Sequence, residues 1–346
     1  MSKNIAYCAD GTWDTSAKHT NVYKLSKTLI RNAGQMVFYD DGVGADGNPI
    51  SKLLGGAFGT GLWNKIKQGY AQIANSYDPG DPLFIFGFSR GAYTARSLAG
   101  MIAICGLPTK NFSDSVVETA FNAYRALTSD LRKELLDSLK DSEMFDAQMT
   151  RVGVWDTVGS LGIPAAVGLN DPILYGFLDT GLHPDIHNAY QALAIDEKRS
   201  EFPPTLWTSE RAPGQTLEQT WFTGVHSDVG GGEPDDVNGA TALSDITLAW
   251  MLSKASALGL QIDPGIPASY KLPLDPKLSL DTLHGSWNIL WGFPRHRIIA
   301  RNAILANSVL VRTEHDSSYR PDNLQFEAGT LSGEYGSTMV VAPPAV

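Results

Sequence analysis

Five short stretches of the chain are apolar at nearly every position, and longer stretches with a helical period alternate with them. The strand-like stretches are residues 4–9, 35–40, 82–88, 150–155 and 219–225. Such strands are buried on both faces, which is typical of a parallel sheet covered by helices. The helical period predicts helices at 20–33, 61–77, 90–105, 114–128, 130–140, 187–197 and 241–258. The alternation predicts a doubly wound α/β fold whose functional loops follow the carboxyl ends of the strands.

Two kinds of segment interrupt this pattern. Residues 107–149 are longer than one crossover needs and carry two charged amphipathic helices. We interpret them as a helical insertion or cap within a single domain that spans residues 1–346, with ordinary helical decoration as the alternative. The segments 160–186 and 285–294 are apolar and rich in glycine and proline or in aromatic residues. They either rim a lipid pocket, and so touch a membrane surface, or pack on the core.

Composition and charge narrow the class of protein. The chain has 346 residues, of which 43% are hydrophobic, and a formal net charge of −10. An acidic chain argues against nucleic acid as a partner, since phosphate recognition needs a basic face. Cys8 and Cys105 both lie in apolar runs and are expected to be buried free thiols, as in a reducing compartment. We find neither a signal peptide pattern nor 18 consecutive apolar residues, which favours a cytoplasmic location.

The chemically most informative stretch is "PLFIFGFSRGAYTARS" at residues 82–97, where a buried strand runs into G-x-S-x-G and then a helix. In this arrangement Ser89 occupies a strained turn, and Gly87 and Gly91 are small enough to let strand and helix approach. The turn exposes the serine hydroxyl at the start of the helix. The backbone N–H of Arg90 then points towards a developing oxyanion. Ser89 is therefore the predicted nucleophile.

A serine nucleophile needs a base and an acid that orients the base. Of seven histidines, His226 follows a clear strand, in "TWFTGVHSDVGGG", and is the predicted base. In this class of site the acid lies between serine and histidine along the chain. Asp156, at the end of "RVGVWD", fits that position, and Asp196 in "ALAIDEKR" is the alternative acid. For Asp196, an ion pair with the neighbouring basic residues is the simpler interpretation.

The first strand ends in "ADGTWD", a stop that two kinds of chemistry use. Phosphatases with D-x-D-G-T attack phosphorus with the first aspartate. Cys8 occupies that position here, and a thiol cannot form an aspartyl phosphate, which argues against a phosphatase of this type. The remaining interpretation is a loop whose Gly11 or Thr12 N–H is the second oxyanion donor, with Asp10 as a brace. A metal site made of acidic residues is the alternative, and its ligands would be Asp10, Asp14, Asp40 and Asp41.

These motifs occur together in a recognisable order. "DGTW", "GFSRGAYTAR", "GVWDTVGS", "ALAIDEKR", "WFTGVHSDVGGG", "LSDITLAWM" and "HDSSYRPDNL" span roughly residues 5–325. In this combination the chain resembles the bacterial α/β-hydrolase domain family, long listed as a domain of unknown function, that includes type VI secretion phospholipase effectors. The resemblance implies a Ser89–Asp156–His226 triad.

The sequence thus predicts a serine hydrolase of carboxylic esters that works through an acyl-enzyme and needs no metal or cofactor. Lipid or phospholipid esters are the expected substrates. A small-ester carboxylesterase is the alternative within the same class, and a non-catalytic binding module on a hydrolase fold is the alternative from a different class. If the chain is an effector, the resemblance implies export by a type VI-like system and a secretion-system or immunity protein as partner.

Overall fold

The structure is a computed structural model that describes residues 2–11, 16–42, 57–147, 150–158, 181–291 and 293–343. Its centre is an eight-stranded sheet in the order β12-β9-β8-β7-β6-β3-β1-β2. Along the chain these strands are β1 (Asn4–Ala9), β2 (Gln35–Asp40), β3 (Leu83–Phe88), β6 (Thr150–Trp155), β7 (Ile186–Ala194), β8 (Thr216–Phe222), β9 (Ile304–Ala306) and β12 (Gly336–Thr338). Neighbouring strands pair in parallel, so their carboxyl ends meet at one edge.

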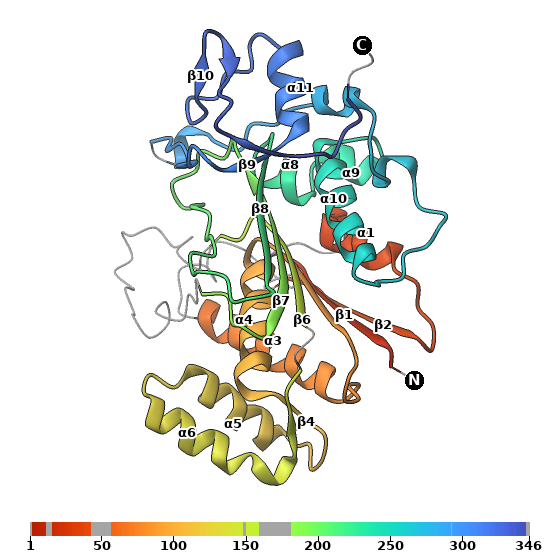
Figure 1. Ribbon diagram of the computed structural model, residues 1–346, viewed down its shortest axis with the longest axis vertical. Helices are drawn as coiled ribbons and strands as arrows, with labels where there is room; N and C mark the ends of the chain where they lie inside the picture. Colours follow the sequence, from red (N-terminus) through yellow and green to blue (C-terminus); the bar gives the residue numbers. More distant parts are fainter. Residues whose placement is uncertain are drawn as a thin grey trace.

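Helices cover both faces of this sheet (Figure 1). They are α1 (Asn21–Thr28), α3 (Ala57–Ala74), α4 (Ser89–Cys105), α5 (Asp114–Arg125), α6 (Ser129–Ser138), α8 (His226–Gly230), α9 (Pro234–Asn238), α10 (Leu243–Ala257) and α11 (Asn307–His315). Helices α3 and α4 share one hydrophobic core with the sheet, and α1 and α10 share the core on the other face. The molecule is therefore a three-layer α/β structure.

Short elements complete the chain. Two small ladders pair β4 (Leu107–Pro108) with β5 (Met144–Phe145) and β10 (Phe326–Glu327) with β11 (Thr330–Leu331). The 3₁₀ turns are η1 (Ser16–Lys18), η2 (Lys140–Ser142), η4 (Ala268–Tyr270), η5 (Pro276–Leu280) and η6 (Ile289–Trp291).

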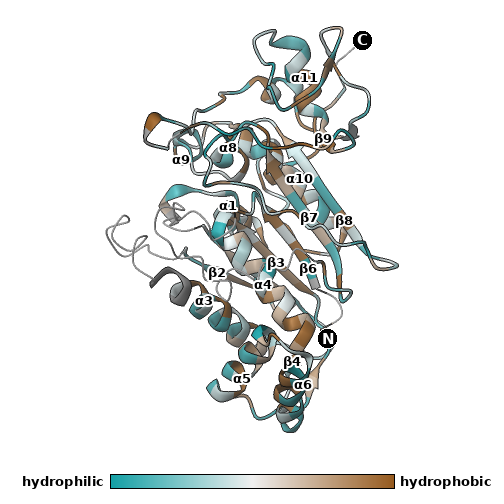
Figure 2. Cartoon of the chain, turned by 90° about the vertical axis from the view of Figure 1, so that its left-hand side faces the viewer, coloured by the Kyte–Doolittle hydropathy of each residue, from teal (hydrophilic) through white to brown (hydrophobic). Residues whose placement is uncertain are grey.

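The apolar runs of the sequence form the inner strands because both of their faces are covered. In β1, Tyr7 packs in the core under α3 and α4, whereas Cys8 packs in the core under α1 and α10. In β3, Ile85 and Phe86 alternate between the same two cores. Figure 2 shows the ribbon of β3 mostly in the hydrophobic colour. A strand buried on both sides has no polar face, which explains the continuous apolar runs.

The strand order places a topological switch point between β1 and β3. The chain goes from β1 to β2 on one side, and then crosses to β3 on the other side of β1. In open parallel sheets, the crevice at such a switch point, outside the carboxyl ends of the strands, is the usual ligand site. Ser89 follows β3 and Asp10 follows β1, so both lie at this crevice.

The doubly wound α/β fold expected from the sequence is confirmed. All five expected strands are present, the last of them shifted to Thr216–Phe222, and six of the seven expected helices are present with small shifts at their ends. The helix expected at 187–197 is wrong, because residues Ile186–Ala194 form strand β7 between β6 and β8. Its alanines, leucine and glutamine favour helix intrinsically. Pairing on both edges and burial on both faces override that preference.

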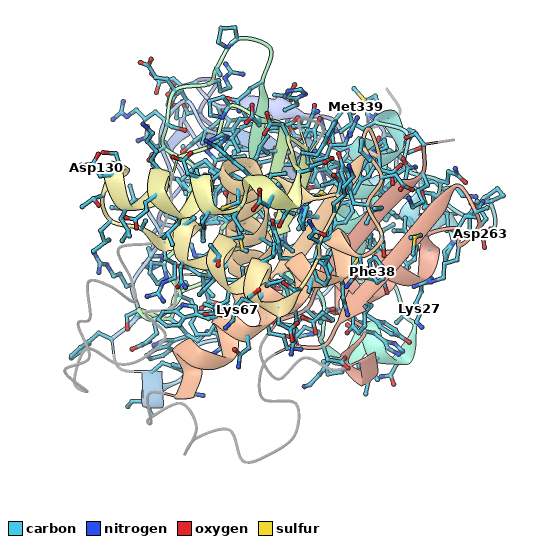
Figure 3. All side chains as sticks on the ribbon, turned by 90° about the horizontal axis from the view of Figure 1, so that it is seen from below. Lys27, Phe38, Lys67, Asp130, Asp263 and Met339 are labelled. Atoms are coloured by element: carbon cyan, nitrogen blue, oxygen red, sulfur yellow. The ribbon has the colours of Figure 1, made fainter. Side chains whose placement is uncertain are left out.

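The segment 107–149 contains α5 and α6, as expected, and these helices pack on each other and on α3 and α4. Figures 1 and 3 place them at the lower end of the molecule, whereas the carboxyl ends of the strands point to the upper end. This position argues against a cap over the functional edge, and its role as an insertion stays a prediction. Most of the apolar segment 160–186 lies outside the described residues.

No helix in the described part of the chain is long and apolar enough to span a membrane. The two cysteines are free and buried, as expected from the sequence. Burial raises the pKa of both thiols, to about 12 for Cys105. Because a thiol reacts as its thiolate, neither group is reactive in the folded protein.

We therefore expect a thiol reagent such as Ellman's reagent to modify neither cysteine in the native protein at neutral pH. Both should react after denaturation in guanidinium chloride. The measurement is the absorbance of the released thiolate, with and without denaturant. Rapid labelling of Cys8 in the native protein would contradict the packing of β1 against both helical layers.

Candidate active site

Ser89 lies at the sharp turn between β3 and α4, and its backbone is in the left-handed region with φ of 57°. A Cβ atom on Gly87 would lie 2.3 Å from the carbonyl oxygen of Gly91. A Cβ atom on Gly91 would lie 2.3 Å from the carbonyl oxygens of Ala9 and Asp10. Both glycines therefore allow backbone contacts that larger residues would block, as the motif predicted. The contact with Asp10 also places the loop after β1 next to the turn.

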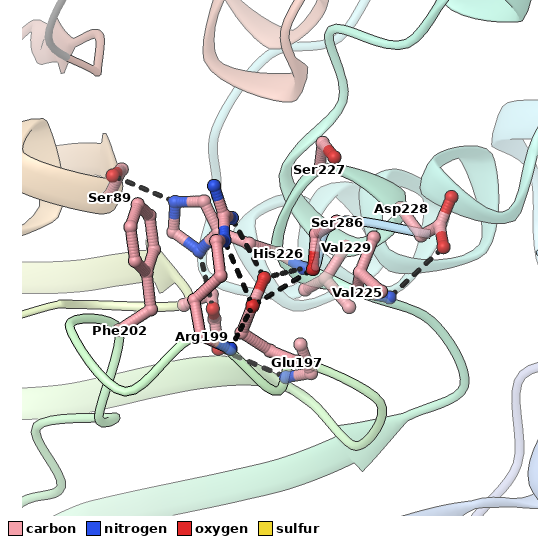
Figure 4. A network of polar contacts seen from close by, with 12 residues as sticks. Ser89, Glu197, Arg199, Phe202, Val225, His226, Ser227, Asp228, Val229 and Ser286 are labelled. Atoms are coloured by element: carbon pink, nitrogen blue, oxygen red, sulfur yellow. Dashed lines mark hydrogen bonds and ion pairs between the residues drawn. The ribbon is translucent and has the colours of Figure 1, made fainter. Parts of the chain in front are cut away.

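His226 joins Ser89 to Asp156 through its two ring nitrogens (Figure 4). Its Nε2 atom lies 2.8 Å from Oγ of Ser89, and its Nδ1 atom lies 2.5 Å from Oδ2 of Asp156. The ring packs against Phe88, with centroids 4.6 Å apart. Gly230 permits this position of α8, since a Cβ there would lie within 1.9 Å of the Phe88 ring. Three side chains from the ends of β3, β6 and β8 thus form one hydrogen-bonded chain.

Asp156 is fully buried and is held by a buried guanidinium as well as by His226. Nη1 of Arg297 donates to Oδ1 at 2.6 Å, and Nη2 donates to Oδ2 at 2.8 Å. The backbone N–H of Ala194 also donates to Oδ1, at 3.0 Å. Burial would raise the pKa of Asp156, but the charge of Arg297 and the hydrogen bonds outweigh it and hold the pKa well below its usual range. The carboxylate is therefore ionised at any pH at which the protein would be assayed.

Burial lowers the pKa of His226 below its ordinary value, and the positive charge of Arg199 acts in the same direction. The hydrogen bond that His226 donates to Asp156 and the negative charge of Asp156 oppose this shift without reversing it. The imidazole is therefore neutral near pH 7, and one of its nitrogens can accept a proton. A neutral imidazole beside a serine hydroxyl can remove the proton of that hydroxyl.

A second layer of polar contacts supports the histidine from the segment after β7. Glu197 accepts hydrogen bonds from Nε and Nη2 of Arg199, at 3.0 and 2.8 Å, and from the backbone N–H of His226 at 3.3 Å. Burial raises the pKa of Glu197, but the bonds and charge of Arg199 outweigh it and lower the pKa to about 2. Arg199 in turn stacks on Phe202, whose ring lies 5.1 Å from that of His226.

Asp196, the alternative acid, lies at the end of β7, and the structure does not bring it to the imidazole of His226. Its Oδ2 atom accepts the backbone N–H of Gly224 at 2.7 Å and the hydroxyl of Tyr319 at 2.9 Å. The ion pair that the sequence suggested for Asp196 is wrong, because Arg199 pairs with Glu197 and the two hydrogen-bond donors to Asp196 are neutral. Asp196 joins the ends of β7 and β8.

Asp10 accepts three hydrogen bonds from uncharged donors. These come from Gly11 N–H at 2.8 Å, from the Thr20 hydroxyl at 2.7 Å and from the Tyr39 hydroxyl at 2.7 Å. Burial raises its pKa to about 6 despite these bonds. Because the Gly11 N–H donates to Asp10, the expectation of Gly11 as an oxyanion donor is not supported. Thr12, the other expected donor, lies outside the described residues, so its role stays a prediction.

The alternative of a metal site at this loop gains no support from the arrangement. Both carboxylate oxygens of Asp10 are engaged, and Asp40 accepts bonds from the Tyr7 hydroxyl and from Lys65. Asp14 lies outside the described residues. Among the described residues, no three His, Cys, Asp or Glu side chains gather as a metal site would require.

A pocket of about 580 Å³ opens beside Ser89 and His226. Phe88, Phe202 and Trp291 provide its apolar walls. Lys18, Arg90 and Arg199 bring positive charge to it, and Glu233 brings negative charge. The aromatic residue Trp291 comes from the segment 285–294, which therefore does rim a pocket, as one of the two interpretations of this segment proposed. No described residue of 107–149 lines it.

Sequence reasoning missed Arg297 and Glu197. Arg297 occurs in "FPRHRII", more than 60 residues beyond the last predicted site residue, and follows no predicted element. The sequence indicates only that a buried carboxylate requires a positive partner, and this requirement does not say where in the chain that partner lies. Glu197 follows Asp196 in "AIDEKR". Because a helix was expected at 187–197, it was not apparent from the sequence that both acids follow a strand.

Together, the parallel sheet and the serine turn define a doubly wound α/β protein with a strained serine turn at its switch point. Residues 3–254 match the family model described as the T6SS phospholipase effector Tle1-like catalytic domain. The match covers more than half of the chain, so the chain belongs to this family, and the resemblance drawn from its motifs is confirmed.

Individual relatives are more distant. The chain is 29% identical over 234 residues to the uncharacterized protein YEL023C of Saccharomyces cerevisiae, covering 60% of this chain and 33% of that one. A crystal structure of an uncharacterized Pseudomonas aeruginosa protein is similar at 17% identity and a TM-score of 0.47, covering 78% and 49% of the two chains. The Tle1 effector bound to the VgrG spike is similar at 19% identity and a TM-score of 0.36, covering 67% and 51%. The chain thus spans a third to a half of the length of these relatives.

The geometry around Asp156 makes a prediction about stability. Replacing Arg297 with methionine would leave a buried carboxylate without its cation, so we expect the free energy of unfolding at pH 7 to fall by about 3–5 kcal/mol. The depressed pKa of Asp156 contributes stability above the ordinary aspartate pKa, and this contribution is lost as pH falls through the folded value. The deficit of Arg297→Met should therefore shrink below pH about 4.

Urea denaturation at several pH values measures this deficit. Arg301→Met is the matched control, because Arg301 is 71% exposed and lies 3.9 Å from its carboxylate partner. It should change the free energy of unfolding by less than about 0.5 kcal/mol. An Arg297→Met deficit that does not vary with pH would show that the guanidinium acts through packing instead of through its charge on Asp156.

Proposed function

We propose that the protein hydrolyses carboxylic esters of lipids through an acyl-enzyme formed on Ser89. The observation that carries this proposal is the hydrogen-bonded chain from Ser89 through His226 to Asp156 at the mouth of a pocket. Membership in a family of phospholipase effectors supports the choice of lipid esters.

In the proposed reaction, Oγ of Ser89 attacks the ester carbonyl carbon while Nε2 of His226 takes the hydroxyl proton. The tetrahedral intermediate collapses, and the imidazolium returns the proton to the leaving alcohol. Water then attacks the acyl-enzyme by the same route in reverse and releases the carboxylic acid and free Ser89. Asp156 holds the imidazole in the tautomer with its proton on Nδ1 and stabilises the transient positive charge.

The negative charge on the carbonyl oxygen needs hydrogen-bond donors. Arg90 belongs to the first turn of α4, and first-turn N–H groups point out of the helix towards such a charge. For the second donor we propose Thr12 N–H. The loop that holds it follows Asp10, which packs against Gly91 at the same turn.

Phospholipid acyl esters, simple lipid esters and short soluble esters all contain the bond that this site would cleave. The aromatic walls of the pocket favour an acyl chain, and the arginines near it favour an anionic headgroup. The family's description as type VI secretion effectors also supports a secretion-system component as a partner, which stays a proposal.

A substrate panel with matched variants tests the proposal. Wild type should hydrolyse phospholipids in micelles, short soluble esters, or both. Ser89→Ala and His226→Ala should each lower kcat by roughly 10⁴–10⁶-fold. The double variant should be little worse than either single one, because a base without its nucleophile contributes nothing. Ser97→Ala, a buried serine two turns further along α4, is the control and should retain most activity.

Preference for long acyl chains would favour a lipase or phospholipase over a small-ester esterase. Additive losses in the double variant would contradict a shared step. A fluorophosphonate probe that fails to label wild type at Ser89 would sink the catalytic proposal and favour a binding module on the same fold.

The pKa of His226 predicts the acid limb of the pH profile. Burial keeps its pKa below the ordinary value of 6.5, so the base stays neutral at mildly acidic pH. We expect kcat/KM for a soluble ester to be level between pH about 7 and 8 and to fall with an apparent pKa below about 6.5. Initial rates at low substrate concentration across this range measure it. An apparent pKa above 7 would contradict the environment described for the imidazole.

A further inference from the structure

Three exposed apolar side chains lie in one segment that also lines the candidate site. Among the described residues, Phe293, Ile298 and Ile289 are the most exposed large hydrophobic side chains, at 92%, 87% and 84%. All three lie within ten residues of one another in the chain. We call these three residues the apolar tip. Scattered exposed apolar residues are ordinary, but a concentration of this kind in one short segment marks an interaction surface.

The apolar tip is continuous with the pocket beside Ser89. Trp291, which lies between two residues of the tip, lines that pocket and packs edge-on against Phe202, with ring centroids 5.8 Å apart. Phe202 in turn packs edge-on against the ring of His226. Ile298 lines a neighbouring hollow together with Arg199 and Phe202. An apolar path therefore leads from the exposed tip to the imidazole.

The segment that carries the tip is fixed at two points to the residues after β7. The hydroxyl of Ser286 donates to Oε1 of Glu197 at 2.9 Å, and the backbone N–H of Arg295 donates to the carbonyl of Lys198 at 2.8 Å. Glu197 also contacts the backbone of His226. Figure 4 shows Ser286 and Glu197 on one side of the imidazole of His226 and Phe202 and Ser89 on the other, and Arg199 both stacks on Phe202 and pairs with Glu197. The tip is thus held at a defined position relative to the nucleophile.

Local charge identifies the kind of surface that the tip meets. Lys198 and Arg295 are exposed at its base, although the whole chain carries a net charge of −10. The acidic residue Asp322 is also nearby, and its Oδ2 atom lies 3.4 Å from Nε2 of His296. Basic residues beneath exposed apolar side chains are the pattern of segments that enter a bilayer surface and bind anionic headgroups.

We propose that the apolar tip enters the surface of an anionic phospholipid bilayer and thereby places the pocket of Ser89 against the lipid. This inference rests on the proposed function, because a bilayer on this face brings ester groups to the pocket. A folded protein bound over the tip would instead cover the pocket mouth. A second copy of the chain would do the same, and would bring two acidic molecules together.

Vesicle flotation tests the proposal with the full chain carrying Ser89→Ala, so that hydrolysis cannot alter the vesicles. The protein should float with vesicles of phosphatidylcholine and phosphatidylglycerol. Phe293→Ser should weaken partitioning roughly tenfold, since burial of one large apolar side chain contributes about one tenfold factor or more. The triple change Ile289→Ser, Phe293→Ser and Ile298→Ser should abolish flotation.

Leu127→Ser and Met339→Ser are the matched controls, because these side chains are 75% and 66% exposed but lie outside the tip. Both should float like the parent protein. The double change Lys198→Gln and Arg295→Gln should weaken binding to anionic vesicles more than to pure phosphatidylcholine, and added salt should have the same effect.

Several outcomes would overturn the inference. They are flotation of the triple variant at the parent level, equal losses in the Leu127 or Met339 controls, and conversion of a stable dimer to a monomer by the triple change.

A second readout separates this inference from the proposed function. With Ser89 intact, the triple variant should hydrolyse a soluble short-chain ester within about twofold of wild type, since no tip residue belongs to the hydrogen-bonded chain. Ester hydrolysis without any vesicle binding would contradict the membrane role of the apolar tip and would still support the proposed function. Vesicle binding without any ester hydrolysis would do the reverse.

Discussion

The site depends on one buried charge, that of Asp156. Its carboxylate is fully buried and receives four hydrogen bonds, from His226, from the two ends of the Arg297 guanidinium and from the backbone of Ala194. These donors come from separate parts of the chain. The ends of β6, β7 and β8 and the segment after residue 293 therefore meet at one ion. An isolated carboxylate at this depth would take up a proton, so the ion exists only while these partners are in place.

The same arrangement determines the chemistry of the imidazole. A carboxylate with no other partner would stabilise the imidazolium strongly, but the bidentate arginine already neutralises Asp156. Asp156 orients the ring through Nδ1 and raises the pKa of His226, but burial outweighs this effect and keeps that pKa below its ordinary value. Glu197 and Arg199 repeat this arrangement one layer further out, where a buried carboxylate paired with an arginine contacts the backbone of the same histidine.

Local rules were enough to predict the inner strands and the elbow. Residues 83–88 are apolar on both faces and run into Ser89, and Gly87 and Gly91 allow the close backbone contacts that the turn requires. They were not enough for β7, because "IHNAYQALA" favours a helix until β6 and β8 pair with it. Nor could they identify Arg297, since the partner of a buried charge is decided by the tertiary fold. Nor could they show that the N–H of Gly11 donates to the side chain of its own neighbour, Asp10.

Arg297 lies outside the residues by which the family is recognised, although it contacts a residue inside them. The family model covers residues 3–254, which include Ser89, Asp156 and His226. Strands β9 and β12 and the guanidinium that holds Asp156 all come from later residues. A shortened chain ending at the family boundary would keep each of the three hydrogen-bonded side chains and lose the cation that keeps one of them charged. The part of the chain that surrounds the charge of Asp156 is therefore longer than the part that the family model matches.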